Sequence, residues 1–442
     1  MILFINCKFI IFIHNNKITM IRSGKICLSL IYNYLLAPKD SDKDSTTEFN
    51  NRNNKLKSVT KVFENYGGVL AKISQILSID DANSTTFSEC KPFSREKTID
   101  YLKTIYKENK DGFFSNVKYI DFDVLNSGSI GQVHKGIIDD STPVIFKVQY
   151  IGLQEQIKND VHMLDLIVNF LYNFDLTDTL TNIKQKLNEE LDYSRECDNQ
   201  EIIRTEWLFN KNIIVPKLYR NLCNDKIICM EYVNGISFIE FANTASFEHK
   251  NYIAKLLVEF TYTNIHKKDL FYSDIHYGNF LIVPGDDDNF MPKLCILDFG
   301  CLHSLEDGLS QKIKNLHKNI FKTIQRITPT IEDQIDFLNC VKDLGIVSED
   351  NTTVAIGSDE FNYMYEYFKQ QYEPWVNKDF EFTEEKLELI SKKDIEMMKS
   401  WNVPTNMVYF NKIPFGLFHL LTKMKVKHDF TGYFNEMLNI ND

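Results

Sequence analysis

Asp274-Ile-His-Tyr-Gly-Asn279 is followed, nineteen residues later, by Asp298-Phe-Gly300. In phosphoryl-transfer enzymes an Asp positions the attacking hydroxyl, and an Asn and a second Asp hold Mg²⁺ against the β- and γ-phosphates. An Asp-Phe-Gly alone occurs by chance in many long proteins. Because both stretches occur here in this order and at this distance, they predict a phosphoryl-transfer site. Asp274 is its expected catalytic group, and Asn279 and Asp298 are its expected metal ligands.

An apolar, strand-like segment upstream, Pro143–Tyr150, contains one lysine, Lys147. Burying an ammonium group is unfavourable unless an anion pairs with it, and a nucleotide phosphate would be such an anion. The alternative is an edge-strand lysine whose ammonium reaches solvent. Together with the downstream motifs, the pattern favours Lys147 as a catalytic-site lysine that contacts the α- and β-phosphates.

A glycine-rich segment precedes this lysine, in the sequence Asn126-Ser-Gly-Ser-Ile-Gly-Gln-Val-His134. Small residues followed by β-formers are typical of a loop whose backbone N–H groups close over phosphates, although an ordinary hairpin turn would look similar. The phosphate-binding interpretation involves Gly128, Ser129, Gly131 and Val133.

A second strand-like segment, Ile227–Glu231, leads into a short turn that ends at Gly235. In kinases the corresponding hinge offers backbone groups to adenine. The sequence therefore predicts that Glu231 and Val233 contact the nucleotide base.

Three further signatures carry a family resemblance. Lys72-Ile-Ser-Gln75 is similar to a Lys-x-Gly-Gln segment, and Ser129-Ile-Gly-Gln-Val-His134 is similar to the end of an alanine-rich loop. Glu190-Leu-Asp-Tyr-Ser-Arg-Glu196 is similar to a Glu-x-Asp motif and the glutamate after it. With these signatures, the chain from about Ser58 to near the C-terminus resembles the UbiB/aarF-domain atypical kinases. It is most similar to the branch that supports coenzyme Q biosynthesis in mitochondria.

The resemblance implies an α+β, two-lobed protein-kinase-like fold, with an N-terminal helical extension packed over the cleft and a helical C-terminal lobe. The expected segments are 1–39 (basic and apolar), 40–56 (polar linker), 57–117 (helical extension), 118–232 (N-lobe) and 233–442 (C-lobe). Two positions depart from the family pattern. Ser74 replaces a glycine, and Gly128 replaces an alanine, which allows a positive φ and a closer approach of N–H groups to phosphates.

Helical periodicity supports the extension. Apolar residues from Val59 to Ile79 recur with a helical period, and Lys72 and Gln75 lie off the apolar side. On spacing alone, a solvated Lys–Gln pair on a surface helix is the simpler interpretation. The resemblance implies instead that Lys72 and Gln75 face the nucleotide.

A second helical pattern covers Leu180–Leu208. A kinase needs a helix carboxylate to hold its strand lysine, and the resemblance prefers Glu190 to Glu189 as the partner of Lys147. Asp192 and Glu196 lie four residues apart, so they would be neighbours on one helix face and could share a cation such as Lys72 or a metal ion. A plain acidic, solvated face is the alternative.

Some regulatory features of protein kinases are missing. Ser273 occupies the position where loop-phosphorylated kinases place an Arg. A helical pattern over Leu309–Ile327 begins soon after Gly300, without the Ala-Pro-Glu motif that protein kinases use in docking peptides. His276 is interpreted either as a phosphate contact or as a structural imidazole.

The 442 residues, 43% of them hydrophobic, can bury a large core, and the net charge of −11 argues against a nucleic-acid partner. The nine cysteines show no Cys-x-x-Cys or metal spacing, which fits free thiols in a reducing compartment. The first 39 residues carry four lysines, one arginine and no acid. They are interpreted as a mitochondrial presequence, a membrane-surface segment or an untargeted tail.

The predicted activity is Mg²⁺-dependent ATP binding, with hydrolysis or phosphoryl transfer to a small molecule or lipid. The resemblance implies support of ubiquinone biosynthesis, with quinone precursors and a membrane surface as partners and the mitochondrion as location. A cytoplasmic or membrane-associated location is the alternative. A serine/threonine protein kinase and a non-catalytic, nucleotide-dependent scaffold remain alternative functions.

Overall fold

The computed structural model describes residues 94–108, 117–128, 130–139, 141–155, 157–158, 188–285, 290–306, 308–325, 329–348, 354–402 and 404–440. The predicted segments 1–39 and 40–56 and the Val59–Ile79 helix lie outside these residues. The chain divides into two compact units: residues 1–193 with 219–229, and residues 194–218 with 230–442. Among the described residues, no helix is both long and apolar enough to cross a membrane.

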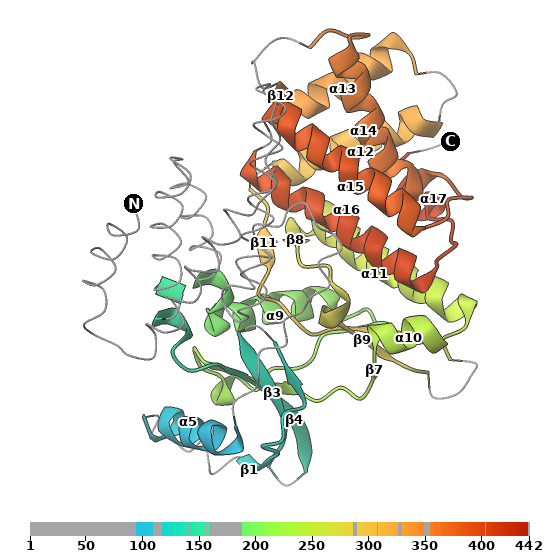
Figure 1. The fold of residues 1–442 in the computed structure, drawn as a ribbon. Coiled ribbons are helices and arrows are strands. Elements are labelled where there is room, and N and C mark those ends of the chain that lie inside the picture. The colour runs from blue at the N-terminus through green and yellow to red at the C-terminus, as the bar shows by residue number, and fades with distance from the viewer. Residues whose placement is uncertain are drawn as a thin grey trace, which may run out of the picture. The chain divides into compact units, whose positions relative to one another are not determined.

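The first unit contains a five-stranded sheet (Figure 1). Its strand order is β1-β3-β4-β6, and β2 pairs with β3. The elements are α5 (Arg95–Glu108), β1 (Val117–Ile120), β2 (Asn126–Ser127), β3 (Gly131–Ile138), β4 (Thr142–Gln149), the single turn η1 (Arg220–Leu222) and β6 (Ile227–Glu231), whose last two residues belong to the second unit.

The antiparallel register of β3 and β4 separates two chemically different faces. Val133 lies opposite Lys147, so these side chains share one face. Gln132 lies opposite Val148 on the other face, together with the buried Phe146. Leu102 of α5 belongs to the same apolar cluster as Phe146 and Val148, so α5 covers the face that does not carry Lys147.

The second unit is mainly helical (Figure 1). Its helices are α9 (Tyr193–Trp207, in this unit from Ser194), α10 (Phe238–Thr244), α11 (Phe247–Lys267), η2 (Tyr277–Asn279), α12 (Leu309–Gln325), α13 (Ile331–Asp343), α14 (Asp359–Val376), α15 (Glu384–Ser400), α16 (Thr405–Met424) and α17 (Thr431–Leu438). Its strands are β5 (Ile213–Ile214), β7 (Ile236–Ser237), β8 (Leu270–Tyr272), β9 (Phe280–Val283), β10 (Lys293–Ile296), β11 (Leu302–Ser304), β12 (Val347–Ser348) and β13 (Trp401–Asn402).

Strands β5, β10, β9 and β7 form one sheet in that order, and β8 pairs with β11. Helix α16 packs between α11 and α15 (Figure 1). Local sequence explains several helix starts: the Ser246 hydroxyl accepts a hydrogen bond from the His249 N–H, and Thr330 and Asp333 form a capping box.

A cluster of aromatic residues fills the centre of the second unit. The rings of Tyr262, Trp375 and Phe434 pack edge to face or tilted against one another. Two buried histidines lie in this cluster, with His317 Nδ1 2.9 Å from His266 Nε2 and His317 Nε2 2.8 Å from the Tyr372 hydroxyl. Burial lowers the pKa of His266 to about 3 and holds that of His317 well below its ordinary value.

Two predicted helices can be compared with the structure. The helix predicted over Leu309–Ile327 is confirmed from Leu309 to Gln325 as α12, and its last two residues lie outside the described ones. The helix predicted over Leu180–Leu208 is wrong as one continuous element, because a helical turn at residues 188–190 ends before Leu191 and Asp192, and α9 starts afresh at Tyr193. The Leu191 carbonyl accepts a hydrogen bond from the Gln149 side chain instead of continuing the helix.

Candidate active site

The catalytic stretch is held together by contacts among its own residues. Strand β8 leads into Asp274, and the turn η2 places Asn279 beside it. Asn279 Nδ2 donates to the Asp274 carbonyl at 3.0 Å and to Asp274 Oδ2 at 2.8 Å. Because this amide nitrogen is committed to Asp274, the amide oxygen of Asn279 is the atom that suits a metal ion.

Asp298 is joined to this stretch through the backbone. The Leu297 N–H donates to the Asn279 carbonyl at 2.9 Å, and Asp298 Oδ1 accepts from the Gly300 N–H at 3.0 Å. Burial, followed by the charges of Asp298 and Asp274, raises the pKa of Tyr272 well above its usual range, so both carboxylates lie near this one phenol. The structure therefore brings Asp274, Asn279 and Asp298 together.

Ser273 links the stretch before Asp274 to the stretch after Gly300. Its N–H and its hydroxyl donate to the Cys301 carbonyl at 3.1 and 3.2 Å. Strand β11 then pairs with β8, and α12 begins at Leu309, five residues after β11 ends at Ser304. The segment that docks peptides in protein kinases therefore has no counterpart in this short connection.

The sequence offered two interpretations of Glu196, a cation shared with Asp192 or a solvated acidic face, and the structure buries it beside the Asp298 loop. This glutamate of α9 is only 4% exposed, whereas Asp192, just before the helix, is exposed. Glu196 Oε2 lies 3.9 Å, and Asp298 Oδ1 3.4 Å, from the point where a Cβ on Gly300 would stand. The expectation that Asp192 and Glu196 are neighbours on one helix face is therefore wrong, because Asp192 precedes α9. Glu196 lies beside the Asp298 loop.

The sequence around Glu196 carries a signal for its burial. Glu196, Gln200, Ile203 and Trp207 follow one another at spacings of four, three and four, which places them on one helix face, and all four are buried. The polar Glu196 and Gln200 at the start of α9 lie on the same buried face as the apolar Ile203 and Trp207 at its end. A buried polar extension of an apolar stripe indicates a side chain with a specific internal role.

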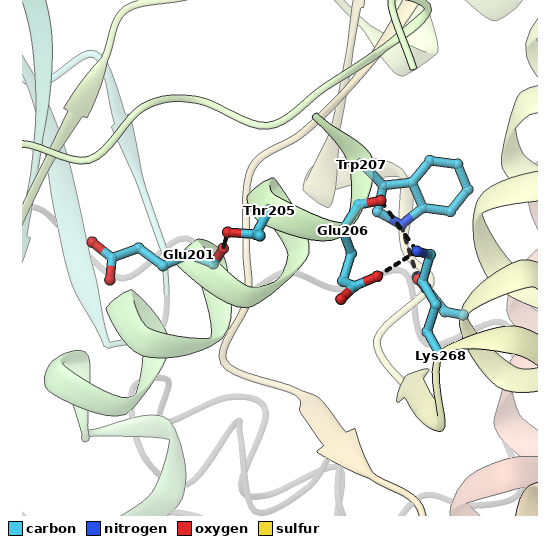
Figure 2. A network of polar contacts seen from close by, with 6 residues as sticks. Glu201, Thr205, Glu206, Trp207 and Lys268 are labelled. Carbon is cyan, nitrogen blue, oxygen red and sulfur yellow. Dashed lines mark hydrogen bonds and ion pairs between the residues drawn. The ribbon is translucent and has the colours of Figure 1, made fainter. Parts of the chain in front are cut away.

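Helix α9 is held to other elements of the second unit at both ends. Near its start, Asn199 Nδ2 donates to the Phe299 carbonyl at 2.8 Å. At its end, Trp207 Nε1 donates to Asn264 Oδ1 at 2.9 Å, and Lys268 Nζ contacts the Glu206 carbonyl at 3.1 Å and pairs with its carboxylate (Figure 2). These contacts hold Glu196 in a fixed place relative to the Asp298 loop.

The first unit gathers the predicted phosphate-binding residues on one face of its sheet. Gly131, Val133 and Lys147 share the face away from α5, and Lys147 Nζ lies 5.5 Å from the Tyr193 ring centroid. A Cβ on Gly131 would meet the Val148 carbonyl at 2.6 Å and the Tyr193 hydroxyl at 2.7 Å. Only glycine therefore fits at this position without a shift of its neighbours.

Gly128 differs from Gly131. Its N–H donates to the Gly131 carbonyl at 2.8 Å, and a Cβ there would come no closer to another residue than 3.8 Å. The positive φ that a glycine allows is not used at this position. Ser129, Lys72 and Gln75 lie outside the described residues.

Glu190 is half-buried in the helical turn before Leu191. The Leu191 carbonyl accepts from Gln149 Nε2 at 2.9 Å, and Gln149 lies two residues after Lys147 on β4. This hydrogen bond ties the Glu190 segment to the strand of the lysine.

In the predicted hinge, the Glu231 N–H donates to the Lys217 carbonyl at 2.8 Å, and Glu231 Oε2 accepts from the Lys217 N–H at 3.1 Å. The turn after β6 continues through the half-buried Val233. His276 has a structural role in its own loop, because its Nδ1 accepts from the Gly278 N–H at 3.0 Å.

The donor atoms of Asp274, Asn279 and Asp298 are all oxygens, a set that suits Mg²⁺ and not the softer metals that prefer thiolate or imidazole. Within the described ranges, no cluster of three or more His, Cys, Asp or Glu side chains has metal-binding spacing. A metal at this site would therefore need the Asn279 amide and the phosphates of a nucleotide to complete its coordination.

Comparison with known proteins adds the following findings. Residues 85–327 match the ABC1 atypical kinase-like domain. Curated relatives include the probable serine/threonine-protein kinase abkD of Dictyostelium discoideum (27% identity, 46% of this chain and 30% of the relative). The probable protein kinase UbiB of Azotobacter vinelandii is 22% identical over 62% of this chain and 52% of its own length. The mitochondrial atypical kinase COQ8B of Rattus norvegicus is 26% identical over 53% and 45%.

The chain thus spans about a third to about half of the length of these relatives. Among solved structures, Rv3197 of Mycobacterium tuberculosis, determined with erythromycin, has a TM-score of 0.61 and 20% identity and covers 90% of this chain and 98% of its own. At this identity the likeness concerns the fold alone. The domain match and the mixed helix and sheet architecture confirm the predicted α+β, protein-kinase-like fold.

Proposed function

This chain belongs to the ABC1 atypical kinase-like family, as the resemblance in its sequence predicted, and from this premise we propose that it is an enzyme that binds Mg²⁺–ATP and cleaves the γ-phosphoryl bond. The phosphoryl group passes either to water or to a small molecule or lipid. The observation that carries the proposal is the contact of the Asn279 amide with the Asp274 carboxylate, beside Asp298.

The proposed roles follow from this arrangement. Asp298 and the amide oxygen of Asn279 hold Mg²⁺, which neutralises charge on the β- and γ-phosphates when it is bound. Asp274 orients the attacking hydroxyl or water by accepting its proton. The Asn279 amide donates to the Asp274 carbonyl and carboxylate, and so keeps that carboxylate in one orientation.

The remaining predicted residues act on the nucleotide in this proposal. Lys147 neutralises the α- and β-phosphates, with a helix carboxylate as its partner. Glu190 is the partner that the family pattern prefers. The strand and loop that surround the phosphates contribute Gly128, Ser129, Gly131 and Val133, the base is recognised at Glu231 and Val233, and further contacts come from Lys72, Gln75 and His276.

The proposed phosphoryl acceptor is a lipid or a quinone precursor. The proposed place of the reaction is a membrane surface in the mitochondrion. The names of the relatives UbiB and COQ8B support a link to ubiquinone biosynthesis, and COQ8B is named as mitochondrial. The short connection from β11 to α12 argues against a peptide acceptor. The name of abkD, a probable serine/threonine-protein kinase, keeps protein phosphorylation as the competing function.

The test is ATP turnover by the purified full chain with Mg²⁺, in the presence and absence of phospholipid vesicles, a soluble quinone-precursor mimic and a peptide library. Asp298→Asn is the key variant, since the amide keeps an Oδ1 that can accept from the Gly300 N–H but loses the anionic ligand. Turnover should fall by about 100-fold or more. Undiminished turnover in this variant would exclude the proposed metal site. Nucleotide binding without turnover in the wild type would favour the scaffold alternative.

A further inference from the structure

Two buried polar residues of the Ser129–His134 signature, Gln132 and His134, have no role in the function proposed above. Gln132 and His134 are 1% and 0% exposed, and they alternate along β3 with Gly131 and Val133. Since alternate residues of a strand point to opposite faces, Gln132 and His134 lie on the α5 side of the sheet, away from Lys147. Both are polar, and both lie beside an apolar cluster, so each needs an internal hydrogen-bond partner.

These partners form a continuous polar bridge from α5 to β3. Gln132 Nε2 donates to Thr98 Oγ1 at 2.7 Å and lies 2.9 Å from His134 Nε2. His134 Nδ1 lies 2.9 Å from the Asp121 carbonyl, which follows β1. The Thr98 hydroxyl in turn donates to the Ser94 carbonyl at 3.2 Å. Thr98 itself is buried in the first turn of α5.

The direction of each hydrogen bond in the Thr98–Gln132–His134 bridge is fixed. A carbonyl only accepts, so His134 Nδ1 carries the proton, and His134 Nε2 accepts from the Gln132 amide. Both amide hydrogens of Gln132 are then used, one by Thr98 and one by His134. Burial lowers the pKa of His134, which agrees with a neutral ring at neutral pH.

A directional bridge does more than an apolar contact would. Leu102 and the sheet residues could pack in several similar registers, whereas each donor in the bridge has one acceptor at the right place. The bridge therefore fixes the position of α5 along β3. Gln132 is also flanked by Gly131 and Val133, so any displacement of its backbone displaces the proposed phosphate-binding strand.

We propose that the Thr98–Gln132–His134 bridge is a positioning device, through which α5 sets the place of the Gly131–Val133 strand for nucleotide binding. This inference rests on the proposed function, because it assigns a further role at the same nucleotide site. Thr98, Gln132 and His134 are positioning residues in it, because they act through Gly131 and Val133 from the opposite face of the sheet.

The test combines nucleotide affinity with amide hydrogen exchange on the full chain. Thr98→Val and Gln132→Leu should each weaken Mg²⁺–ATP binding about fivefold, and the double variant should be no weaker than Gln132→Leu alone, because both changes break one bridge. Thr98→Ser keeps the hydroxyl and should restore affinity. Thr104→Val is the matched control on the same helix, because the exposed Thr104 hydroxyl, among the residues that the structure describes, bonds within α5 to the Asp100 carbonyl.

Exchange supplies a readout that a purely structural role would not change. Mg²⁺–ATP should slow amide exchange in residues 95–108 of the wild type, although α5 lies on the other face of the sheet, and this protection should vanish in Thr98→Val. If the wild type binds Mg²⁺–ATP and both variants bind it equally well, the positioning role is wrong while the proposed function stands. If the wild type binds no nucleotide, the proposed function is wrong. Should Gln132→Leu fail to fold, Thr98→Val with its Ser rescue decides the matter.

Discussion

Two regions are held in contrasting ways: the catalytic segment of the second unit (residues 274–300) and the glycine strand of the first unit, which is β3 (Gly131–Ile138). Within each motif of the catalytic segment the bonds are short in sequence: Asn279 to Asp274 spans five residues, and Gly300 to Asp298 spans two. Longer backbone bonds, from Leu297 to Asn279 and from Ser273 to Cys301, then join the two motifs. Around the glycine strand the bonds are long: Gln132 to Thr98 spans 34 residues, and Gln149 to Leu191 spans 42. Hydrogen bonds between residues close in sequence can be predicted from a local motif, whereas bonds between distant residues depend on the complete fold.

The largest expected effect concerns the local geometry. Asp274→Asn should lower ATP turnover by about 100-fold or more, because an amide cannot accept the proton of the attacking group. Mg²⁺–ATP affinity should stay within about twofold of the wild type, since Asp298 and Asn279 remain as ligands. Single-turnover kinetics and calorimetric titration measure the two quantities separately. Equal losses in affinity and turnover would show that Asp274 acts as a metal ligand.

The next largest effect should distinguish the two glycines of the first unit, Gly131 and Gly128. Gly131→Ala should destabilise the first unit by about 2 kcal/mol, because the new Cβ would lie 2.6 Å from the Val148 carbonyl. Gly128→Ala should change stability by less than about 0.5 kcal/mol, since its Cβ has room. Amide exchange of β3 and β4 measures both. A tolerated alanine at 131 would mean that Tyr193 and β4 adjust more easily than their packing indicates.

The same contrast explains what the sequence could predict. The roles proposed for Asp274, Asn279 and Asp298 follow from short spacings, and the structure places these three residues together. The continuous helix through Glu190 was wrong, because helical periodicity does not reveal that the Leu191 carbonyl bonds to a strand residue far upstream. The place of Glu196 beside the Asp298 loop was not predicted for a related reason, since the burial of this helix carboxylate depends on a loop about a hundred residues away.

Acid sensitivity should distinguish the second unit through its histidine pair. Burial depresses the folded-state pKa of His266 to about 3 and holds that of His317 well below its ordinary value, whereas an unfolded histidine takes up a proton near pH 6.5. Their contribution to stability is therefore complete above about pH 6.5 and is lost as the pH falls toward about 3. The pair should lower the free energy of unfolding by up to about 2.7 kcal/mol per pH unit in this range.

Tryptophan fluorescence is suited to this measurement, because Trp207, Trp375 and Trp401 all lie in the second unit. The urea midpoint of the fluorescence change should fall between pH 7 and pH 5. A double variant, His266→Leu with His317→Leu, should show a flatter pH dependence. A midpoint that stays constant over this range in the wild type would contradict the buried, neutral state of the pair.

The smallest expected effect tests whether α9 belongs with the catalytic segment. Lys268→Met removes the contacts to the carbonyl and the carboxylate of Glu206 (Figure 2) and should destabilise the second unit by about 1 kcal/mol. Glu206→Gln is the matched control. It keeps the carbonyl contact and weakens only a partly exposed ion pair, so about 0.5 kcal/mol is expected.

Turnover should fall less than about threefold in Lys268→Met, since Asn199 still holds the start of α9 to the Phe299 carbonyl. A loss of turnover greater than about threefold would mean that the far end of α9, and not Asn199 alone, positions Glu196 beside the Asp298 loop.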